Sequence, residues 1–391
     1  MKKDLTLIAA ATLMAACSNE TEVPADNQPG QAIAVTVDQE CLTRATGEIS
    51  TPSKLAQTGF GLFGCYTGRQ TYENTSVSAD FMYNQKVTSD DEGVNWVYNP
   101  LKYWPNSTDV QTGEKYTEYV SFFAYAPYEA TPKDDGRCIF GMSDKYEMGD
   151  PWVNYRLSED PWGETNPQVD LMYGIKYKRV RGHELGDDLF YDQTKPDIND
   201  KMKFYFEHAL SCIGDKITIQ LSKELDEYIH GDETSATGKY ADIIVSDINI
   251  EYENLTTKAR LVLNSPSGPN WKEIISGELT TTRTLKLSPM AELTAEPKEV
   301  STGQGLFYIP LLVKGCEPAK AVITVSYTVR NNNGTMYSGK TSTSFFLSML
   351  TDGEKEGIAL ILGKDLDLLH LTYPIDGTKR ATEPSYSREL K

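Results

Sequence analysis

The sequence predicts an all-β protein built from two β-sandwich domains in tandem. Short segments in which apolar and polar residues alternate recur along the chain, and turn residues separate them. Tyrosine is abundant, with 23 copies, and no long segment has the periodicity of a helix. Without an N-terminal signal about 375 residues remain, enough for two domains of ordinary size. The strand spacing in the second half favours a sandwich with Greek-key connections.

The chain begins with a targeting signal. Met1 to Lys3 is basic, and the apolar run from Leu5 to Ala16 is shorter than the ~20 residues that a membrane-spanning helix needs. Small residues directly before Cys17 resemble a bacterial lipobox, in which the cysteine is acylated and becomes the new N-terminus. We therefore expect residues 1–17 to be a lipoprotein signal ending in a lipidated Cys17. An ordinary secretory signal that is cleaved nearby is the alternative.

A flexible tether and a short strand follow the signal. Residues 18–31 are polar and include two prolines, so they are expected to form the tether. Ile33, Val35 and Val37 alternate with small or polar residues, which predicts a half-buried first strand over residues 32–38. The polar stretch behind this strand contains one isolated arginine, Arg44.

An aromatic strand is the expected centre of the first domain, for which we predict residues 32–200. The segment from Val120 to Tyr128 is apolar on both faces of a two-residue period, which is typical of a strand covered on both sides. A second aromatic segment, from Trp96 to Pro105, lies about twenty residues upstream. We expect the two to pair as a hairpin and to place several rings in one core.

Two tryptophans in repeated Asp-Pro-Trp segments are candidate glycan contacts. Trp152 and Trp162 lie in an acidic, turn-rich region, and exposed tryptophans on loops can stack on sugar rings. The alternative is that both rings cover the ends of a sandwich.

The second domain is predicted over residues 201–374, followed by a polar tail over 375–391. Phe204, Phe206 and His208 alternate on one face, and His208 is expected to be a hydrogen-bonded core residue. The turn Asn331 to Gly334 indicates a hairpin. The other expected strands are 217–221, 243–252, 306–313, 321–329, 335–346 and 358–373.

Composition and motifs argue against several classes of function. The net charge of −18 disfavours binding to nucleic acid. The chain has no phosphate-binding loop, dinucleotide fingerprint or Gly-x-Ser-x-Gly elbow, and its four histidines are scattered. We expect no catalytic residue, metal or cofactor, and hence no enzyme. The six cysteines match no metal or redox spacing, and Cys65 and Cys212 lie in apolar surroundings where buried free thiols are expected.

Several segments together resemble a known family, the fimbrillin-like lipoproteins of Bacteroides-type bacteria, which are subunits of type V pili. The segments that carry the resemblance are the lipobox at Cys17, Thr43-Arg44-Ala45, Phe81 to Asn84, Trp96 to Tyr98, Tyr103 to Pro105, Val120 to Tyr128, and Phe204 to Ser211. They occur in order over most of the first 220 residues. Towards the C-terminus the resemblance is confined to Gly357 to Gly363.

The resemblance implies two transthyretin-like β-sandwich domains and assembly by strand exchange. In the family an arginine-specific protease removes the lipidated segment together with the first strand, and the vacated groove accepts a strand from the next subunit. Arg44 and Ala45 match the cleavage site, and Ile33, Val35 and Val37 lie on the removable strand. The family location is the outer membrane through lipid on Cys17, the cell surface and the fimbrium. Its partners are other pilus subunits, joined by β-strand addition, and a host or bacterial surface ligand.

Three classes of function remain open. A structural and adhesive pilus subunit is the leading hypothesis, with shaft, tip and anchor roles undivided. A surface-anchored glycan-binding lipoprotein that does not polymerise is the second. A hydrolase is the third and weakest, because no nucleophile or matched acid pair can be located.

Overall fold

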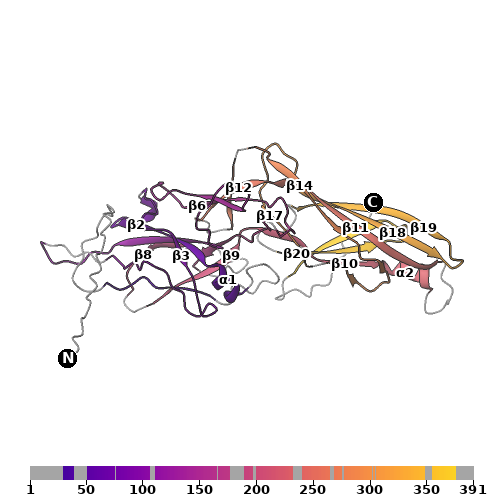
Figure 1. The fold of residues 1–391 in the computed structure, drawn as a ribbon, viewed down its shortest axis with the longest axis horizontal. Helices are drawn as coiled ribbons and strands as arrows, with labels where there is room; N and C mark the ends of the chain where they lie inside the picture. Colours follow the sequence, from indigo (N-terminus) through magenta and orange to yellow (C-terminus); the bar gives the residue numbers. More distant parts are fainter. Residues whose placement is uncertain are drawn as a thin grey trace, which may run out of the picture.

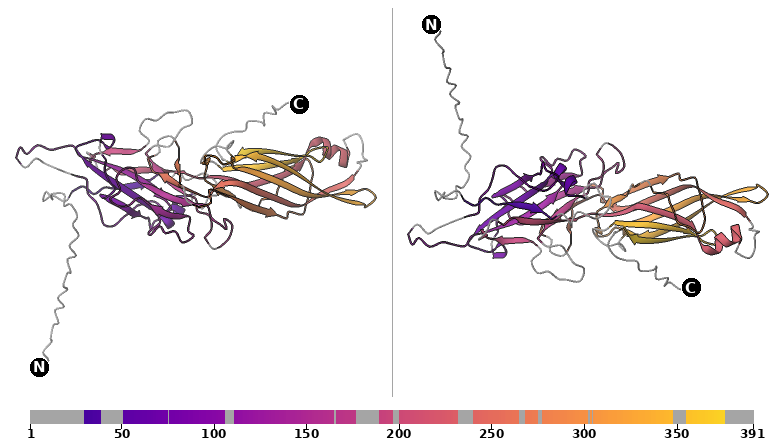
Figure 2. Two further views of the ribbon diagram at one scale, coloured as in Figure 1. Left: turned by 90° about the horizontal axis from the view of Figure 1, so that it is seen from above. Right: turned by 90° about the horizontal axis from the view of Figure 1, so that it is seen from below.

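The chain folds into an elongated, mostly β molecule, shown as a computed structural model (Figure 1). The structure describes residues 30–38, 51–74, 76–105, 111–164, 166–176, 189–196, 200–231, 240–264, 268–274, 277–301, 303, 305–347 and 355–375. The expected all-β class is therefore confirmed. Cys17, Arg44 and Ala45 lie outside the described residues, as do most of the tether and tail. The two halves of the chain occupy opposite ends of the long axis in all three ribbon views (Figures 1 and 2).

Two sheets form the N-terminal half. The larger has the order β1-β9-β7-β4-β2-β3, with β8 also paired to β4. Its strands are β1 (Val35–Val37), β2 (Phe60–Gly68), β3 (Met82–Val87), β4 (Tyr119–Ala126), β7 (Met172–Ile175), β8 (Phe190–Gln193) and β9 (Met202–His208). The smaller has the order β13-β12-β6-β5, with β5 (Ile139–Met142), β6 (Trp152–Arg156), β12 (Lys258–Val262) and β13 (Asn270–Glu273).

Two further sheets form the C-terminal half. The first sheet has the order β16-β10-β20-β21, with β17 also paired to β10. Its strands are β10 (Ser211–Leu221), β16 (Lys298–Glu299), β17 (Leu306–Tyr308), β20 (Lys355–Leu362) and β21 (Leu368–Pro374). The second sheet has the order β14-β11-β18-β19, with β15 also paired to β11. Its strands are β11 (Tyr240–Thr256), β14 (Thr280–Leu287), β15 (Ala291–Glu292), β18 (Lys320–Asn331) and β19 (Met336–Phe346).

Short helical segments cover parts of the sheets. They are α1 (Pro52–Thr58), the 3-10 turn η1 (Tyr72–Asn74) and α2 (Lys223–His230). α1 starts where the Thr51 side chain accepts a hydrogen bond from the Lys54 N–H, and the Ser222 side chain caps α2 in the same way. α1 places Leu55 against the large N-terminal sheet.

Strand β4 is buried on both faces, as its sequence predicts. Phe122 and Ala124 belong to a cluster that includes α1 and β1, which we call the outer core. Phe123 and Tyr125 belong to the main core, which continues into the C-terminal half. All four side chains are at most 1% exposed. β2 behaves in the same way, because Leu62 joins the outer core and Phe63 the main core. The large sheet is thus a middle layer.

The expected hairpin between the two aromatic segments is wrong. Both neighbours of β4 are already strands, because it pairs with β2 on one side and with β7 and β8 on the other. Pro100 and Pro105 also interrupt the upstream segment, and proline has no N–H to donate. That segment makes only the isolated bridges of Val97 to Thr88 and of Tyr103 to Ala32. Its rings nevertheless enter the outer core, where Trp104 lies edge-on to Phe122 at 5.9 Å between centroids.

Two expected elements of the second half are arranged differently. Segment 358–373 is a hairpin, β20 and β21, rather than one strand. The Gly363 N–H donates to the Asp367 carbonyl and Leu366 takes a left-handed conformation, which turns the chain.

β12 and β13 follow residue 200 in sequence, yet β12 pairs with β6 of the N-terminal half (Figure 1). A division at residue 200 therefore does not separate the sheets.

Other local predictions agree with the structure. His208 is buried, and its Nδ1 lies 2.8 Å from an Asp170 carboxylate oxygen. The hairpin at Asn331 to Gly334 joins β18 to β19, and Gly334 has the positive φ of +82° that such a turn requires.

The expected buried thiols are confirmed. Cys65, Cys138 and Cys212 are free and buried, and Cys316 is free and half-buried. Burial raises the pKa of Cys65 and of Cys212 to about 12. Both groups are therefore protonated and unreactive near neutral pH.

We expect alkylation of the folded protein near neutral pH to modify Cys316 well before these three buried cysteines. Unfolding in guanidinium should make all four react, because it removes both the burial and the raised pKa. Peptide mapping by mass spectrometry reads each site separately. Fast labelling of Cys65 in the folded protein would contradict the packing of β2.

Candidate functional site

The first strand lies at one edge of the large sheet, and we treat it and its surroundings as the candidate functional site. β1 runs parallel to β9, with Val35 opposite Met202, Thr36 opposite Lys203 and Val37 opposite Phe204. Only these three pairs form the ladder. Because the ladder is so short, main-chain pairing alone holds the strand weakly.

Apolar side chains of β1 and of Ile33 just before it add to the attachment of this segment. Ile33, Val35 and Val37 are 1%, 2% and 5% exposed. All three belong to the outer core, together with Trp96, Tyr98 and Phe204. They lie on the same side of the segment, as the alternating sequence predicts. We call the part of the outer core that they fill the β1 groove.

Main-chain hydrogen bonds fix both ends of β1. At its start, the Ile33 N–H donates to the Lys102 carbonyl at 2.9 Å and the Trp104 N–H donates to the Gln31 carbonyl at 3.0 Å. At its end, the Asp38 N–H donates to the Phe204 carbonyl at 2.9 Å. β1 is therefore held between β9 and the loop at 102–104.

Tyr98 adds a buried hydrogen bond to the strand. Its hydroxyl donates to the Ile33 carbonyl at 2.7 Å. Burial raises the pKa of this hydroxyl, so Tyr98 stays protonated and able to donate. Tyr98 was missed as a site residue, because nothing in the sequence links it to a strand 65 residues upstream.

Without β1 the groove would be open. The β9 edge would expose the Met202 N–H, which now donates to the Ala34 carbonyl at 2.9 Å. The Phe204 carbonyl and the Tyr98 hydroxyl would lose their partners on β1 as well. An unpaired edge beside an apolar groove is a template for adding another strand.

The two candidate glycan residues are held by the protein itself. The Trp152 Nε1 donates to Glu147 Oε1 at 2.9 Å, and the Arg260 guanidinium carbon lies 3.5 Å from the Trp152 ring centroid. The Trp162 Nε1 donates to the Gly305 carbonyl at 3.2 Å, and its ring packs against the main core. Both side chains therefore have structural partners.

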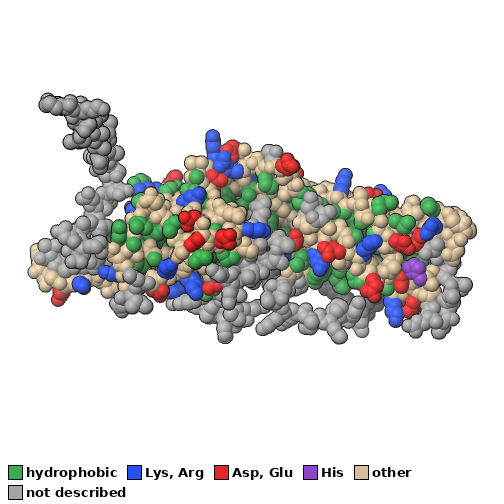
Figure 3. All heavy atoms as spheres, turned by 60° about the horizontal axis from the view of Figure 1, so that its bottom comes forward, with side chains coloured by type: hydrophobic (Ala, Val, Ile, Leu, Met, Phe, Trp, Pro, Cys, Tyr) green, Lys and Arg blue, Asp and Glu red, His purple; other side chains and the backbone are tan. Residues whose placement is uncertain are grey.

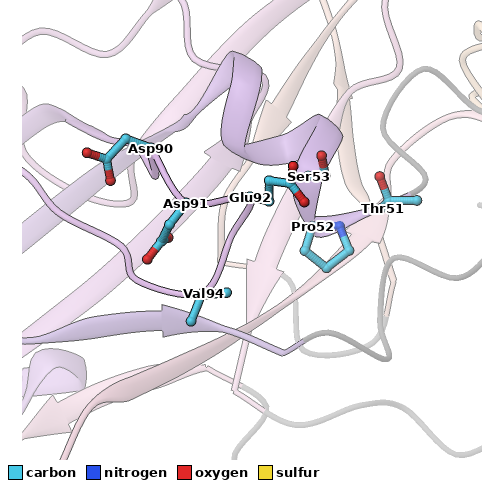
Figure 4. Close-up of a pocket in the computed structure, with 7 residues that line it drawn as sticks. All are labelled: Thr51, Pro52, Ser53, Asp90, Asp91, Glu92 and Val94. Carbon is cyan, nitrogen blue, oxygen red and sulfur yellow. The ribbon is translucent and has the colours of Figure 1, made fainter.

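Two hollows lie at the surface of the N-terminal half. The first is wide and acidic, and its lining residues are Thr51, Pro52, Ser53, Asp90, Asp91, Glu92 and Val94 (Figure 4). The Asp91 carboxylate is already engaged, because it accepts hydrogen bonds from Ser89 and from the Asn95 main chain and side chain. The second hollow, of about 370 Å³, adjoins β9 and includes Trp104, Lys201 and Lys203 in its lining.

The described residues contain neither a metal site nor a membrane-spanning helix. No cluster of three or more histidine, cysteine or acidic side chains suitable for a metal ion occurs among the described residues. Within the same part of the chain, no helix is both long and apolar enough to cross a membrane.

The Tyr98 bond to β1 can be tested by substitution. Tyr98→Phe should lower the free energy of opening of β1 by about 1–3 kcal/mol, because the buried Ile33 carbonyl loses its donor. Hydrogen–deuterium exchange of the peptide covering residues 30–38 should then be faster. Tyr103→Phe, whose side chain is exposed, is the matched control. Unchanged protection of β1 in Tyr98→Phe would contradict this role.

Comparison with known proteins identifies relatives of the chain. No protein-family model matches it. It is 25% identical over 214 residues to the fimbrium subunit Fim1C of Phocaeicola vulgatus. This match covers 54% of the chain and 50% of Fim1C, so the chain spans about half the length of that relative.

A solved structure shows the same fold. The crystal structure of a fimbrial protein from Bacteroides vulgatus matches with a TM-score of 0.63 at 18% identity, over 89% of this chain and 99% of that one. Both relatives are fimbrial proteins rather than enzymes. The predicted resemblance is thus confirmed, and the chain is a relative of the fimbrial subunits of Bacteroides-type bacteria.

Proposed function

We propose that the chain is a structural subunit of a cell-surface fimbrium and that subunits join by strand exchange at the β1 groove. The observation that carries the proposal is the attachment of β1, a short N-terminal strand that fills an apolar groove through only three ladder pairs. Such a strand can leave without breaking the order of the remaining strands.

The proposed assembly begins with export as an outer-membrane lipoprotein. Acylated Cys17 holds the chain at the membrane, and an arginine-specific protease cuts after Arg44, so that Ala45 becomes the new N-terminus. The cut lies six residues beyond Asp38, so β1 stays on the lipidated fragment. From then on only non-covalent contacts hold β1 in the groove.

The energetics allow exchange but not an empty groove. Burial of Ile33, Val35 and Val37 contributes about 4.5–9 kcal/mol, at ~1.5–3 kcal/mol per side chain. The total stability of a domain is typically ~5–15 kcal/mol. Loss of β1 is therefore a large destabilisation, which a strand from another subunit would reverse. The difference in free energy between the empty and the refilled groove drives polymerisation.

The proposal also covers the strand connections, the place of the subunit in the fimbrium and its ligand. We propose that the two sandwiches have transthyretin-like connections, and that the subunit serves as shaft or tip, with a surface ligand as a further partner. A glycan-binding lipoprotein that does not polymerise is less well supported, because the indole N–H groups of Trp152 and Trp162 are already bonded within the protein.

Substitution of the cleavage arginine tests this function. In cells, the assembled protein should begin at Ala45, whereas Arg44→Ala should keep acylated Cys17 and should not form polymers. N-terminal analysis and intact mass identify the start, and electrophoresis without boiling shows the polymers. Arg137→Ala, a change at an arginine in another part of the sequence, is the control and should polymerise normally. Polymers whose subunits begin at Cys17 would refute the proposal.

A further inference from the structure

We infer that the β1 groove recognises an acidic residue placed directly after the third apolar residue of the strand that fills it, and that Lys203 is the residue that recognises it. This inference rests on the proposed strand exchange, and it specifies which strands the groove accepts.

The apolar contacts cannot set the register by themselves. Ile33, Val35 and Val37 are similar β-branched side chains repeated every two residues. A strand shifted by two residues still points apolar side chains into the groove. The hydrogen bonds to β1 that involve Lys102, Tyr98 and Phe204 use main-chain atoms of the strand, so they are insensitive to its sequence. Another contact must distinguish the correct alignment from the shifted one.

Asp38 makes a contact that depends on its side chain. It follows Val37 directly, and its carboxylate oxygen Oδ2 lies 3.4 Å from Lys203 Nζ. Its side chain is 13% exposed, and its N–H bond to the Phe204 carbonyl fixes its position. Ala34, just before β1, and Thr36 within it are the other outward residues of this segment, and neither carries a charge. Asp38 is therefore the one charged group that β1 presents to β9.

The surroundings of Lys203 favour an acidic residue. Lys176, Lys201 and Lys203 all line the second hollow, and Asp200 is the one acidic residue among the described residues of its lining. The Asp200 carboxylate already accepts a hydrogen bond from the Lys201 N–H at 2.9 Å. In a chain of net charge −18, whose acidic and basic side chains are interspersed over the face in Figure 3, this hollow is locally positive. It attracts a carboxylate and repels a lysine at the same place.

Two kinds of misalignment lose this contact. A shift of two residues toward the C-terminal end of β9 moves the carboxylate about 7 Å farther from Lys203, beyond its reach. A shift of one residue turns the carboxylate toward Phe204 and the outer core, where an unpaired charge is strongly disfavoured. The Asp38–Lys203 pair therefore disfavours both of these shifts and selects strands with an acidic residue at this place.

Competition between peptides tests the inference. The protein cut after Arg44 is mixed with fluorescent, amidated peptides of residues 30–38 in which residue 38 is Asp, Asn or Lys, and incorporation is followed by polarisation. We expect the Asn peptide to bind about two- to fivefold more weakly than the Asp peptide, and the Lys peptide more weakly still. The differences should shrink at high salt because the charges are partly exposed.

Charge reversal supplies the specific control. Lys203→Glu should reverse the preference, so that the Lys peptide binds better than the Asp peptide. Lys216→Glu changes a similarly exposed lysine that faces Glu299 on another strand, and it should leave the preference intact. In the uncut chain, Lys203→Glu should also speed hydrogen–deuterium exchange of residues 30–38 about two- to fivefold.

The outcomes separate the two proposals. Incorporation of all three peptides with equal affinity, or a preference that Lys203→Glu does not reverse, overturns the role of Lys203 but leaves strand exchange standing. Failure of every peptide to enter the cut protein overturns strand exchange, and the inference falls with it. Unchanged exchange of β1 in uncut Lys203→Glu would independently contradict the contact.

Discussion

The structure depends on the burial of the large N-terminal sheet on both faces. Phe123 and Tyr125 of β4 connect this sheet to the main core, and Phe122 and Ala124 support the outer core. Only the outer core includes β1. Loss of β1 therefore removes contacts from one face of the sheet, while the packing against the C-terminal half is kept.

This layered arrangement explains how a groove can open without general unfolding. Phe60 packs within about one ring diameter of its neighbours, with centroid distances of 5.4 Å to Trp96 and 5.1 Å to Phe206. These rings come from strands and a loop that follow Arg44 in sequence, so they remain after the proposed cut. They line the base of the β1 groove. Closure of the empty groove would require these large rings to repack, so they resist it.

The sequence predicts features that depend on local pattern. The run from Val120 to Ala126 has no polar face, and the structure buries it on both sides. The alternation of Ile33, Val35 and Val37 likewise identifies one groove-facing side. Contacts between distant segments leave no such pattern. Nothing near Tyr98 or Lys203 indicates that both touch β1, and nothing in β12 indicates that it pairs with β6. The turn between β20 and β21 does have a local signal, because Gly363, Lys364 and Asp365 interrupt the apolar pattern there.

The connection between the halves bears on how an assembled fimbrium would carry load. β12 and β13 return from the C-terminal half to the sheet of β6, so the chain crosses the junction more than once. Gln168 donates to the Gly305 carbonyl at 2.6 Å and accepts from the Phe307 N–H at 2.9 Å, and Trp162 bonds the same Gly305 carbonyl. Force applied along the molecule would have to break a shared sheet and a shared core before the halves could separate. Under the proposed strand exchange, tension in a fimbrium would pass through this shared sheet and core within each subunit. The β1 groove, filled by a single short strand, would be the joint between subunits.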